Sequence, residues 1–183
     1  MKIIVRNAGD RNIDHIKIAV PEDELVIIHN EENAMSAFCE ALEAAGDDSA
    51  VHMEDDIELC NNFYEKLTEI INKAPNEVIQ FFSMRKDDLT IGTRFISGRR
   101  FLMGQCFYLP KGMSKEIRAY KDTWKRIEEH PTGLDTMVAD YLGDNKLDYL
   151  NIVPNLVDHL PVKSLINPRR STKRQSFTFR KGE

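Results

Sequence analysis

The chain has 183 residues, of which 42% are hydrophobic, and a formal net charge of −5 at pH 7. A chain of this length and composition can bury the core of one domain without covalent cross-links. Its three cysteines lie far apart with no CxxC pair, which argues against a disulfide framework or a zinc cage. The N-terminal apolar run is too short for a signal peptide, and no stretch approaches the ~20 apolar residues of a membrane span. We therefore expect one cytoplasmic domain with no membrane span.

Short apolar segments alternate with helical patterns along the chain. The expected strands are KIIV (2–5), ELVIIH (24–29), AVHM (50–53), NEVIQFF (76–82), RFLMGQCFYL (100–109) and LDYLNIV (147–153). The expected helices cover residues 35–42, 63–71, 114–127 and 134–142, with Gly46 ending the first and the second ending before Pro75. Strands that alternate with helices predict an α/β sandwich with a mostly parallel central sheet. Sheets of this kind bind ligands at the carboxyl ends of their strands.

Three adjacent carboxylates follow the third expected strand, in the segment VHMEDDIELC (51–60). Glu54, Asp55 and Asp56 repel one another, and at the carboxyl end of a buried strand they would face the ligand crevice. Carboxylate oxygens suit Mg²⁺ or Mn²⁺, and such ions keep positions open for substrate phosphates. A solvated turn or the acidic start of a helix explains the same triplet equally well. The triplet by itself leaves both interpretations open.

A cation site and a cap predict different effects of removing one acid. If the triplet binds a cation, the empty site crowds like charges, so Asp56→Asn is expected to leave the metal-free protein as stable as the parent or slightly more so. The same change should abolish the response of the melting temperature to Mn²⁺. A capping role predicts a loss of about 0.5 to 2 kcal/mol, with the response to metal intact.

Four segments carry a resemblance to a known family. They are SAFCEALEAAGDDSAVHMEDDIELCNNFYEKL (36–67), FLMGQCFYLPKGM (101–113), GLDTMVADYL (133–142) and IVPNLVDHLPVKSLI (152–166). In these segments the chain resembles glycosyltransferases of the GT-A fold, in particular family 25, and the acidic triplet is similar to their DxD motif. The resemblance implies a Rossmann-like three-layer α/β/α sandwich, with one catalytic domain over residues 1–168. A small viral or phage member of the family would have this length.

The resemblance also implies an activity. Such enzymes move a sugar from a nucleotide-sugar donor, most often a UDP-sugar, to a hydroxyl group, and Mn²⁺ or Mg²⁺ stabilises the leaving diphosphate. The metal ligands implied are Glu54, Asp56 and His159, and the general base of an inverting transfer is Asp135. The resemblance also implies Asp55 as a donor-binding residue. Lys163, Ser164 and Arg169 follow His159 closely, and their charge and hydrogen-bond donors make them candidates to bind the phosphates of the donor.

Two of these residues also have an ordinary structural explanation. His159 stands beside Asp158, and most isolated histidines are surface or packing residues. Asp135 lies at the beginning of an expected helix, where an acid commonly caps the first turn. Only the positions of His159 and Asp135 in the family pattern favour a role in the reaction.

The C-terminal end is basic, and its charge affects which acceptor the sequence predicts. From Lys163 onward there are seven Lys and Arg against one Glu, which leaves 18 of the 25 basic and 29 of the 30 acidic residues before it. We therefore define residues 169–183 as a basic C-terminal arm, which either is solvated or touches phosphates. The expected acceptor is a surface carbohydrate, with a hydroxymethylated DNA base as the alternative.

Two other classes of protein fit the same residues. One is a metal-dependent phosphoryl-transfer enzyme or nuclease, in which clustered acids hold two ions and the basic arm binds nucleic acid. The other is an inactive GT-A-like binding module, because a fold by itself does not determine an activity.

Overall fold

The structure, a computed structural model, describes residues 1–9, 11–30, 32–130, 133–162 and 174–182. Its centre is a seven-stranded sheet with the strand order β2-β1-β3-β7-β5-β8-β6, and β4 and β9 form a second sheet of two strands. The strands are β1 (Lys2–Asn7), β2 (Leu25–His29), β3 (Ala50–Glu54), β4 (Ile57–Leu59), β5 (Val78–Gln80), β6 (Arg94–Ser97), β7 (Cys106–Leu109), β8 (Asp148–Asn151) and β9 (Val157–His159). The helices are α1 (Asp14–Ala19), α2 (Ala34–Ala45), α3 (Phe63–Lys73), α4 (Lys86–Ile91), α5 (Met113–Lys121) and α6 (Leu134–Asp144), with a 3-10 turn η1 (Gly98–Arg100).

The central sheet is mixed. β1 pairs in parallel with β2 and β3, and β5 pairs in parallel with β8. β7 is antiparallel to its neighbours β3 and β5, and β6 is antiparallel to β8. It follows that β1, β2, β3, β5 and β8 run in one direction, whereas β7 and β6 run in the other. The predicted α/β sandwich is confirmed, and the sheet is parallel in its first three strands and mixed in the rest.

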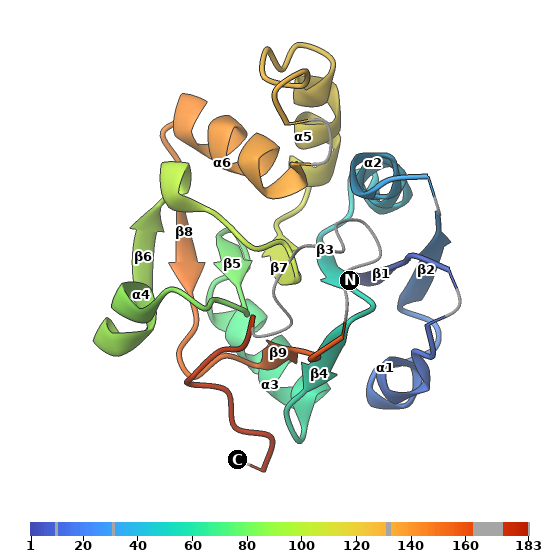
Figure 1. The fold of residues 1–183 in the computed structure, drawn as a ribbon, viewed down its shortest axis with the longest axis vertical. Coiled ribbons are helices and arrows are strands. Elements are labelled where there is room, and N and C mark those ends of the chain that lie inside the picture. The colour runs from blue at the N-terminus through green and yellow to red at the C-terminus, as the bar shows by residue number, and fades with distance from the viewer. Residues whose placement is uncertain (10, 31, 131–132, 163–173, 183) are drawn as a thin grey trace.

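Helices cover both faces of the sheet, as Figure 1 shows. Alternate residues of a strand point to opposite faces, so each strand supplies two cores. Val51 and Cys106 belong to the core on the side of α1 and α3, whereas Phe107 and Tyr149 belong to the core on the side of α2, α5 and α6. The chain therefore forms three layers, with the sheet in the middle.

All six predicted strands are present, but the last three are shorter than predicted: β5 covers Val78–Gln80 of the predicted 76–82, β8 covers Asp148–Asn151 of the predicted 147–153, and the predicted strand 100–109 is shortened most. β7 begins at Cys106, and the preceding residues form a loop. The reason is that buried polar side chains take the carbonyl groups of this stretch: Gln80 donates to the Met103 carbonyl at 3.1 Å and Arg6 donates to the Gly104 carbonyl at 2.7 Å. Backbone carbonyls bound in this way are not available to a strand ladder.

The four predicted helices are also present, and the third ends early. α5 ends at Lys121, whereas the pattern predicted a helix to residue 127. Trp124 is buried instead, and its indole N–H donates to Asp140 of α6 at 2.9 Å, so tertiary packing turns the chain away from the helix axis. Gly46 ends α2 with a φ of 60°, as the pattern predicted. In the described ranges no helix is long and apolar enough to span a membrane.

The described end of the chain, residues 174–182, packs against the folded body. The backbone N–H of Ser176 donates to Asp158 Oδ1, and its hydroxyl donates to Asn155 Oδ1, both at 2.7 Å. The backbone N–H of Asn61 donates to the carbonyl of Lys181 at 2.9 Å. This part of the predicted arm is therefore built into the domain, and the predicted boundary between residues 168 and 169 falls outside the described residues.

Ser176→Ala should lower the free energy of unfolding by about 1 kcal/mol, because it removes a buried hydrogen bond to Asn155. Lys181→Ala is the matched control in the same segment. Its ion pair with Glu58 is exposed, so we expect a change below about 0.5 kcal/mol. Urea denaturation of both variants measures the difference. Equal stability of the two variants would show that the segment is detached in solution.

Candidate functional site

β1, β2, β3, β5 and β8 run in the same direction, so their carboxyl ends lie at one edge of the central sheet, and the site involves four of them, β1, β3, β5 and β8. The residues that end these strands are all polar: Asn7, Glu54, Gln80 and Asn151. The acidic triplet continues from β3 at this edge, as the sequence predicted. This is the edge at which α/β sheets carry their ligand crevices.

A buried arginine holds the first acid of the triplet. Arg6 and Glu54 are register partners on β1 and β3, and Arg6 Nη2 lies 3.6 Å from Glu54 Oε1. The guanidinium also lies over the ring of Phe38, 5.3 Å from its centroid. The Arg6 side chain is 5% exposed, whereas Glu54 keeps 27% of its side chain exposed. Glu54 is thus the acid of the triplet that is most open to a ligand.

Arg11 neutralises the other two acids from the loop after β1. Its Nη1 lies 3.1 Å from Asp55 Oδ1 and 2.8 Å from Asp56 Oδ2. The backbone N–H of Ala8 donates to Asp55 Oδ2 at 2.9 Å. Both oxygens of Asp55 therefore have protein partners, and this side chain ties the β1–α1 loop to the end of β3. The sequence did not predict this structural role for Asp55.

The short sheet of β4 and β9 brings His159 to the third acid. Ile57 of β4 is the register partner of His159, and the backbone N–H of Leu160 donates to the Asp56 carbonyl at 2.8 Å. His159 Nε2 consequently lies 3.2 Å from Asp56 Oδ2. The structure therefore brings together Asp56 and His159, which the sequence analysis had grouped in one site.

Arg174, from the basic C-terminal segment, closes the cluster. Its guanidinium contacts His159 Nε2. Nε2 carries either one hydrogen or one lone pair, so it bonds Asp56 in one protonation state and Arg174 in the other, and in both states it is engaged by the protein. His159 is thus part of a charge network, and among the described residues no group of three or more His, Cys, Asp or Glu is arranged to hold a metal ion. The predicted donor-binding residues Lys163, Ser164 and Arg169 lie outside the part of the chain that the structure describes.

These surroundings push the pKa values of two acids apart. Burial, and then the charge of Asp56, raise the pKa of Glu54 above its ordinary value. Burial acts on Asp56 in the same direction, but the hydrogen bonds and charges of His159 and Arg11 outweigh it and lower the pKa of Asp56 to about 2. At neutral pH the charge of Asp56 is well supported, and the charge of Glu54 is not.

Two carboxylates of the triplet fit a divalent cation. Asp56 Oδ1 is buried and has no hydrogen-bond partner among the described residues, although Oδ2 is paired with Arg11. Glu54 adds a partly exposed carboxylate. Mg²⁺ in particular is commonly held by one or two carboxylates, with water and substrate phosphates in the remaining positions. The residues that could hold Mg²⁺ or Mn²⁺ are therefore Glu54 and Asp56, without His159.

Asp135, the predicted general base, lies at the start of α6 and holds the loop before β7. Its Oδ2 accepts a hydrogen bond from the backbone N–H of Met103 at 3.2 Å, and its Oδ1 accepts one from Thr136 at 3.0 Å. The carboxylate is therefore oriented by two backbone groups. The helix-start position that the sequence indicated is confirmed, and the contact with Met103 is an addition that the sequence did not show.

The loop that Asp135 holds also reaches the triplet. Directly after Met103, the Gly104 carbonyl accepts from Arg6, and the Gln105 carbonyl accepts from the backbone N–H of Glu54 at 2.9 Å. Three consecutive loop residues thus connect Asp135 with the ion pair of Arg6 and Glu54. This connection places the predicted base at the same edge of the sheet as the acids.

Three arginines of the cluster were not predicted from the sequence: Arg6 and Arg11, which pair with the acids, and Arg174, which contacts His159. Arg6 did leave a signal, because a charged residue within the apolar strand KIIVRN is buried only if it is paired. Arg11 and Arg174 lie in irregular segments, where neither periodicity nor spacing indicates a partner. Their roles depend on the path of the loops in three dimensions.

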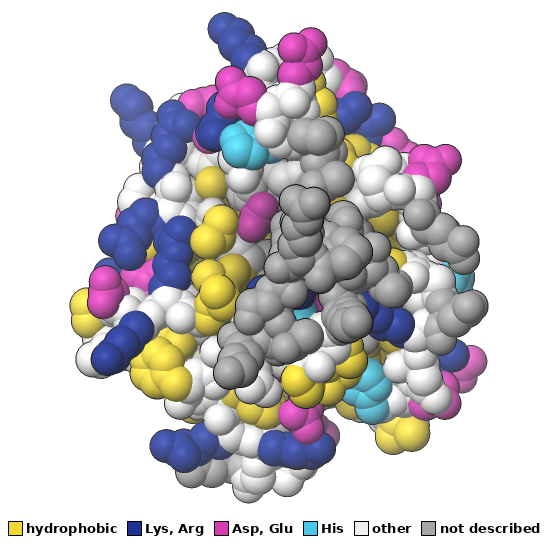
Figure 2. All heavy atoms as spheres, viewed as in Figure 1, with side chains coloured by type: hydrophobic (Ala, Val, Ile, Leu, Met, Phe, Trp, Pro, Cys, Tyr) yellow, Lys and Arg dark blue, Asp and Glu magenta, His cyan; other side chains and the backbone are white. Residues whose placement is uncertain are grey.

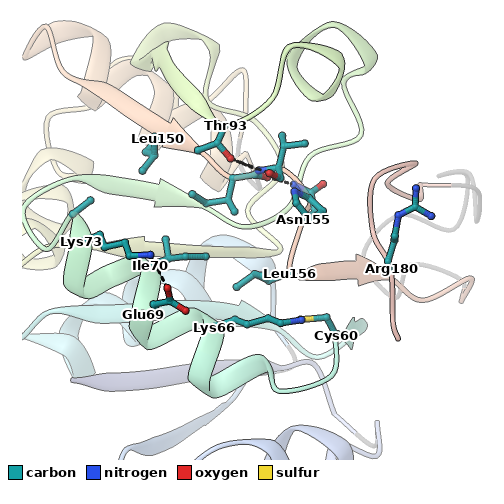
Figure 3. A pocket seen from close by; sticks show the side chains of 14 residues that line it. Cys60, Lys66, Glu69, Ile70, Lys73, Thr93, Leu150, Asn155, Leu156 and Arg180 are labelled. Atoms are coloured by element: carbon teal, nitrogen blue, oxygen red, sulfur yellow. Dashed lines mark hydrogen bonds and ion pairs between the residues drawn. The ribbon is translucent and has the colours of Figure 1, made fainter. Parts of the chain in front are cut away.

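A separate apolar cavity of about 400 Å³ lies between α3 and the connection from β8 to β9, as Figure 3 shows. Ile70, Leu150 and Leu156 form part of its wall, and Lys73 reaches its margin from α3. The lining residues that the structure describes include no member of the acidic triplet, nor His159 or Asp135. The cavity is therefore distinct from the polar cluster at the strand ends.

No protein-family model and no curated protein matches this chain. Among solved structures, the chain is similar to A197 from STIV, with 14% sequence identity and a TM-score of 0.52. The match covers 95% of this chain and 92% of that one. At this level of identity the similarity shows the fold alone, which extends over nearly the whole length of both chains.

Glu54→Gln and Asp56→Asn should change stability in opposite directions. The raised pKa of Glu54 means that folding disfavours its charged form. Glu54→Gln should therefore raise the melting temperature at about pH 8, and the gain should shrink as the pH falls to about 4 and Glu54 itself becomes protonated. The pKa of about 2 means that folding favours the charged form of Asp56, so Asp56→Asn should cost about 2 kcal/mol at neutral pH.

Thermal melts from about pH 2 to about pH 8 measure the effects of Glu54→Gln and Asp56→Asn on stability. The contribution of Asp56 is fully present above its unfolded pKa and is lost as the pH falls through about 2. Glu58→Gln is the control, since its ion pair with Lys181 is exposed and should matter little. This expectation for Asp56→Asn is the opposite of the one from sequence, because Arg11 and His159 lie beside the charge that was expected to be uncompensated. A stabilised Asp56→Asn variant would contradict the charge network described above.

Proposed function

We propose that this chain is a metal-dependent glycosyltransferase that moves a sugar from a nucleotide-sugar donor to a hydroxyl group. The observation that carries the proposal is the pair of carboxylates at the end of β3, Glu54 and Asp56, with guanidinium groups beside them at the carboxyl edge of an α/β sheet. This arrangement agrees with the GT-A fold and the DxD-like motif that the sequence resemblance implies.

In this proposal the carboxylates of the cluster bind the metal ion and the arginines bind the diphosphate of the donor. A bound Mn²⁺ or Mg²⁺ supplies Lewis-acid stabilisation of a leaving nucleoside diphosphate. Glu54 and Asp56 would hold that ion, and Arg6 orients Glu54 through the ion pair between β1 and β3. Arg11 and Arg174 add positive charge at the same place, so they attract and orient the diphosphate of a UDP-sugar.

Asp135 accepts the proton of the acceptor hydroxyl. Each of its oxygens accepts one backbone hydrogen bond and keeps a second lone pair for the acceptor. The acceptor oxygen forms a bond to the anomeric carbon, the bond from that carbon to the diphosphate oxygen breaks with its electron pair, and the proton passes to Asp135. A transfer in one such step inverts the configuration of the sugar.

The cluster suits sugar transfer better than two-metal phosphoryl transfer. Two-metal sites hold ions about 3.5 to 4 Å apart and need several carboxylates to do so. Asp55 is turned toward Ala8 and Arg11, which leaves Glu54 and Asp56 for a single ion. The acceptor in this proposal is a carbohydrate, with a hydroxymethylated DNA base as the rival acceptor.

Mn²⁺ together with UDP should raise the melting temperature of the parent protein. At a ligand concentration 100 times the Kd, the free energy of unfolding should increase by about 2.7 kcal/mol. Asp56→Asn and Glu54→Gln should each lose this rise, because each removes one of the two carboxylates for the ion. Glu58→Gln should keep it. Differential scanning fluorimetry with Mn²⁺, UDP and both together makes the measurement, and a rise that survives in both site variants would rule out the proposed ion site.

Asp135→Asn should lower the turnover of donor sugar about 100-fold or more while leaving the affinity for Mn²⁺ and UDP unchanged. Release of nucleoside diphosphate from a panel of UDP-, GDP- and TDP-sugars measures the rate. Asp140→Asn makes the same chemical change in the same helix, where Asp140 pairs with Arg126, and should retain turnover. A full rate in the Asp135→Asn variant would show that Asp135 only anchors the loop.

A further inference from the structure

Three arginines surround one buried aspartate at the other end of the same sheet edge. Asp88 of α4 has a side chain that is 1% exposed. Arg94 Nη2 and Arg100 Nη2 lie 3.3 Å and 2.9 Å from Asp88 Oδ1, and Arg85 Nη1 lies 3.8 Å from Oδ2. The arginines come from the residue before α4, from β6 and from η1. Separate segments therefore converge on a single carboxylate.

This cluster has more positive charge than Asp88 requires. One carboxylate balances one guanidinium, so two positive charges remain. The side chains of Arg85, Arg94 and Arg100 are 31%, 33% and 52% exposed, and each guanidinium has more N–H donors than its contact with Asp88 uses. A phosphomonoester carries a charge of about −1.5 to −2 at neutral pH, which matches this surplus.

Polar side chains extend from the cluster toward the centre of the edge. Arg94 is the register partner of Asn151, and Asn151 is the register partner of Gln80, so the three side chains lie on one face of β6, β8 and β5. Asn151 is 0% exposed, and neither polar atom of its side chain has a hydrogen-bond partner among the described residues. A buried amide without a partner, next to a basic cluster, indicates a polar ligand.

One loop joins the cluster to the proposed reaction centre. Arg85 donates to the Arg100 carbonyl at 2.6 Å, and the backbone N–H of Met103 donates to Asp135. Because Arg100 and Met103 are three residues apart, their Cα atoms are separated by at most about 11 Å. Figure 2 shows that Lys and Arg side chains gather on the left of this face, over β6 and α4.

The approach of the acceptor follows from this layout. In an inverting transfer the acceptor oxygen attacks from the side opposite the leaving diphosphate. Glu54 and Asp56, which would hold the ion and the leaving diphosphate, lie at the end of β3, and the loop held by Asp135 lies between β3 and the strands β8 and β6. An acceptor that gives its proton to Asp135 therefore comes from the side on which the three arginines lie.

We infer that Arg85, Arg94 and Arg100 bind a phosphate group of the acceptor, which makes the acceptor a phosphorylated saccharide. The role as acceptor rests on the proposed sugar transfer, whereas the binding of the phosphate does not. Guanidinium groups bind phosphate oxygens through pairs of N–H donors, and two surplus charges match one such group. A nucleic acid would require a row of such clusters along its backbone.

Glucose 6-phosphate is the probe for this site, and glucose is the control ligand. Titration calorimetry on the full chain should detect binding of the phosphate sugar and none of glucose. Arg100→Gln should weaken this binding about tenfold, because it removes a charge-assisted hydrogen-bond donor. Arg99→Gln is the matched control, since the Arg99 guanidinium pairs with Asp140 and Asp144 instead. Asp88→Asn should tighten binding at least about threefold, because it removes the carboxylate that competes for the arginines.

The outcomes separate this site from the proposed function. Absence of glucose 6-phosphate binding overturns the inference, and so does equal weakening by Arg99→Gln and Arg100→Gln, which indicates general charge attraction. Duplex DNA that binds more tightly than the sugar phosphate and responds to Arg100→Gln also overturns it. Melting curves check that each variant is folded. If Asp88→Asn does not fold, Arg85→Gln is measured in its place, and it should weaken the binding of glucose 6-phosphate. A parent protein that binds the sugar phosphate but shows no response to Mn²⁺ and UDP contradicts the sugar transfer alone.

Discussion

Neutralisation of three successive acids at the end of β3 is the constraint on which this site depends. Carboxylates that leave a buried strand together are costly unless cations and hydrogen bonds compensate them. Arg6 pairs with Glu54 from the neighbouring strand and Arg11 pairs with Asp56 from the loop after β1, while Arg174 of the C-terminal segment adds positive charge through its contact with His159. Because these segments are far apart in the chain, the same electrostatic requirement that stabilises the triplet also draws them to one edge of the sheet.

The compensation of the acids is uneven, and this unevenness supports the proposed role of the cluster. Asp56 is held as an ion by Arg11 and His159, while burial raises the pKa of Glu54 beside its charged neighbour. A divalent cation with a bound diphosphate would find one carboxylate already ionised and a second that gains from a nearby positive charge. Sites that separate the pKa values of adjacent acids are frequent at functional centres.

The loop before β7 connects the two halves of the sheet edge. Its carbonyl groups are bound by Gln80 and Arg6, and its backbone N–H at Met103 is bound by Asp135. These side chains hold the loop across the ends of β3, β7 and β5, between the acidic triplet and the arginines around Asp88. The positions of the proposed donor and acceptor therefore depend on one short segment that the strand pattern had assigned to a longer β7.

Much of the fold could be predicted from the sequence, because local patterns encode it. The six longer apolar segments are strands, the four periodic segments are helices, and Gly46 ends α2, since these features need only near neighbours along the chain. The position of the triplet at a strand end follows from the same patterns. The elements α1, α4, β4, β6 and β9 were missed, because their short sequences contain too many polar residues to show an apolar run or a helical period, and distant partners stabilise them instead.

The sequence by itself thus determined the class of the fold, the edge at which the acids emerge and the helix start occupied by Asp135. Only the tertiary structure decided which charges the acids meet, that His159 joins a network with Arg174, and that Asp55 serves the β1–α1 loop. The physical reason is the distance along the chain over which the interactions act. Secondary structure is set by interactions over a few residues, whereas an ion pair such as that of Arg11 and Asp56 forms between segments whose approach depends on the packing of the whole sheet.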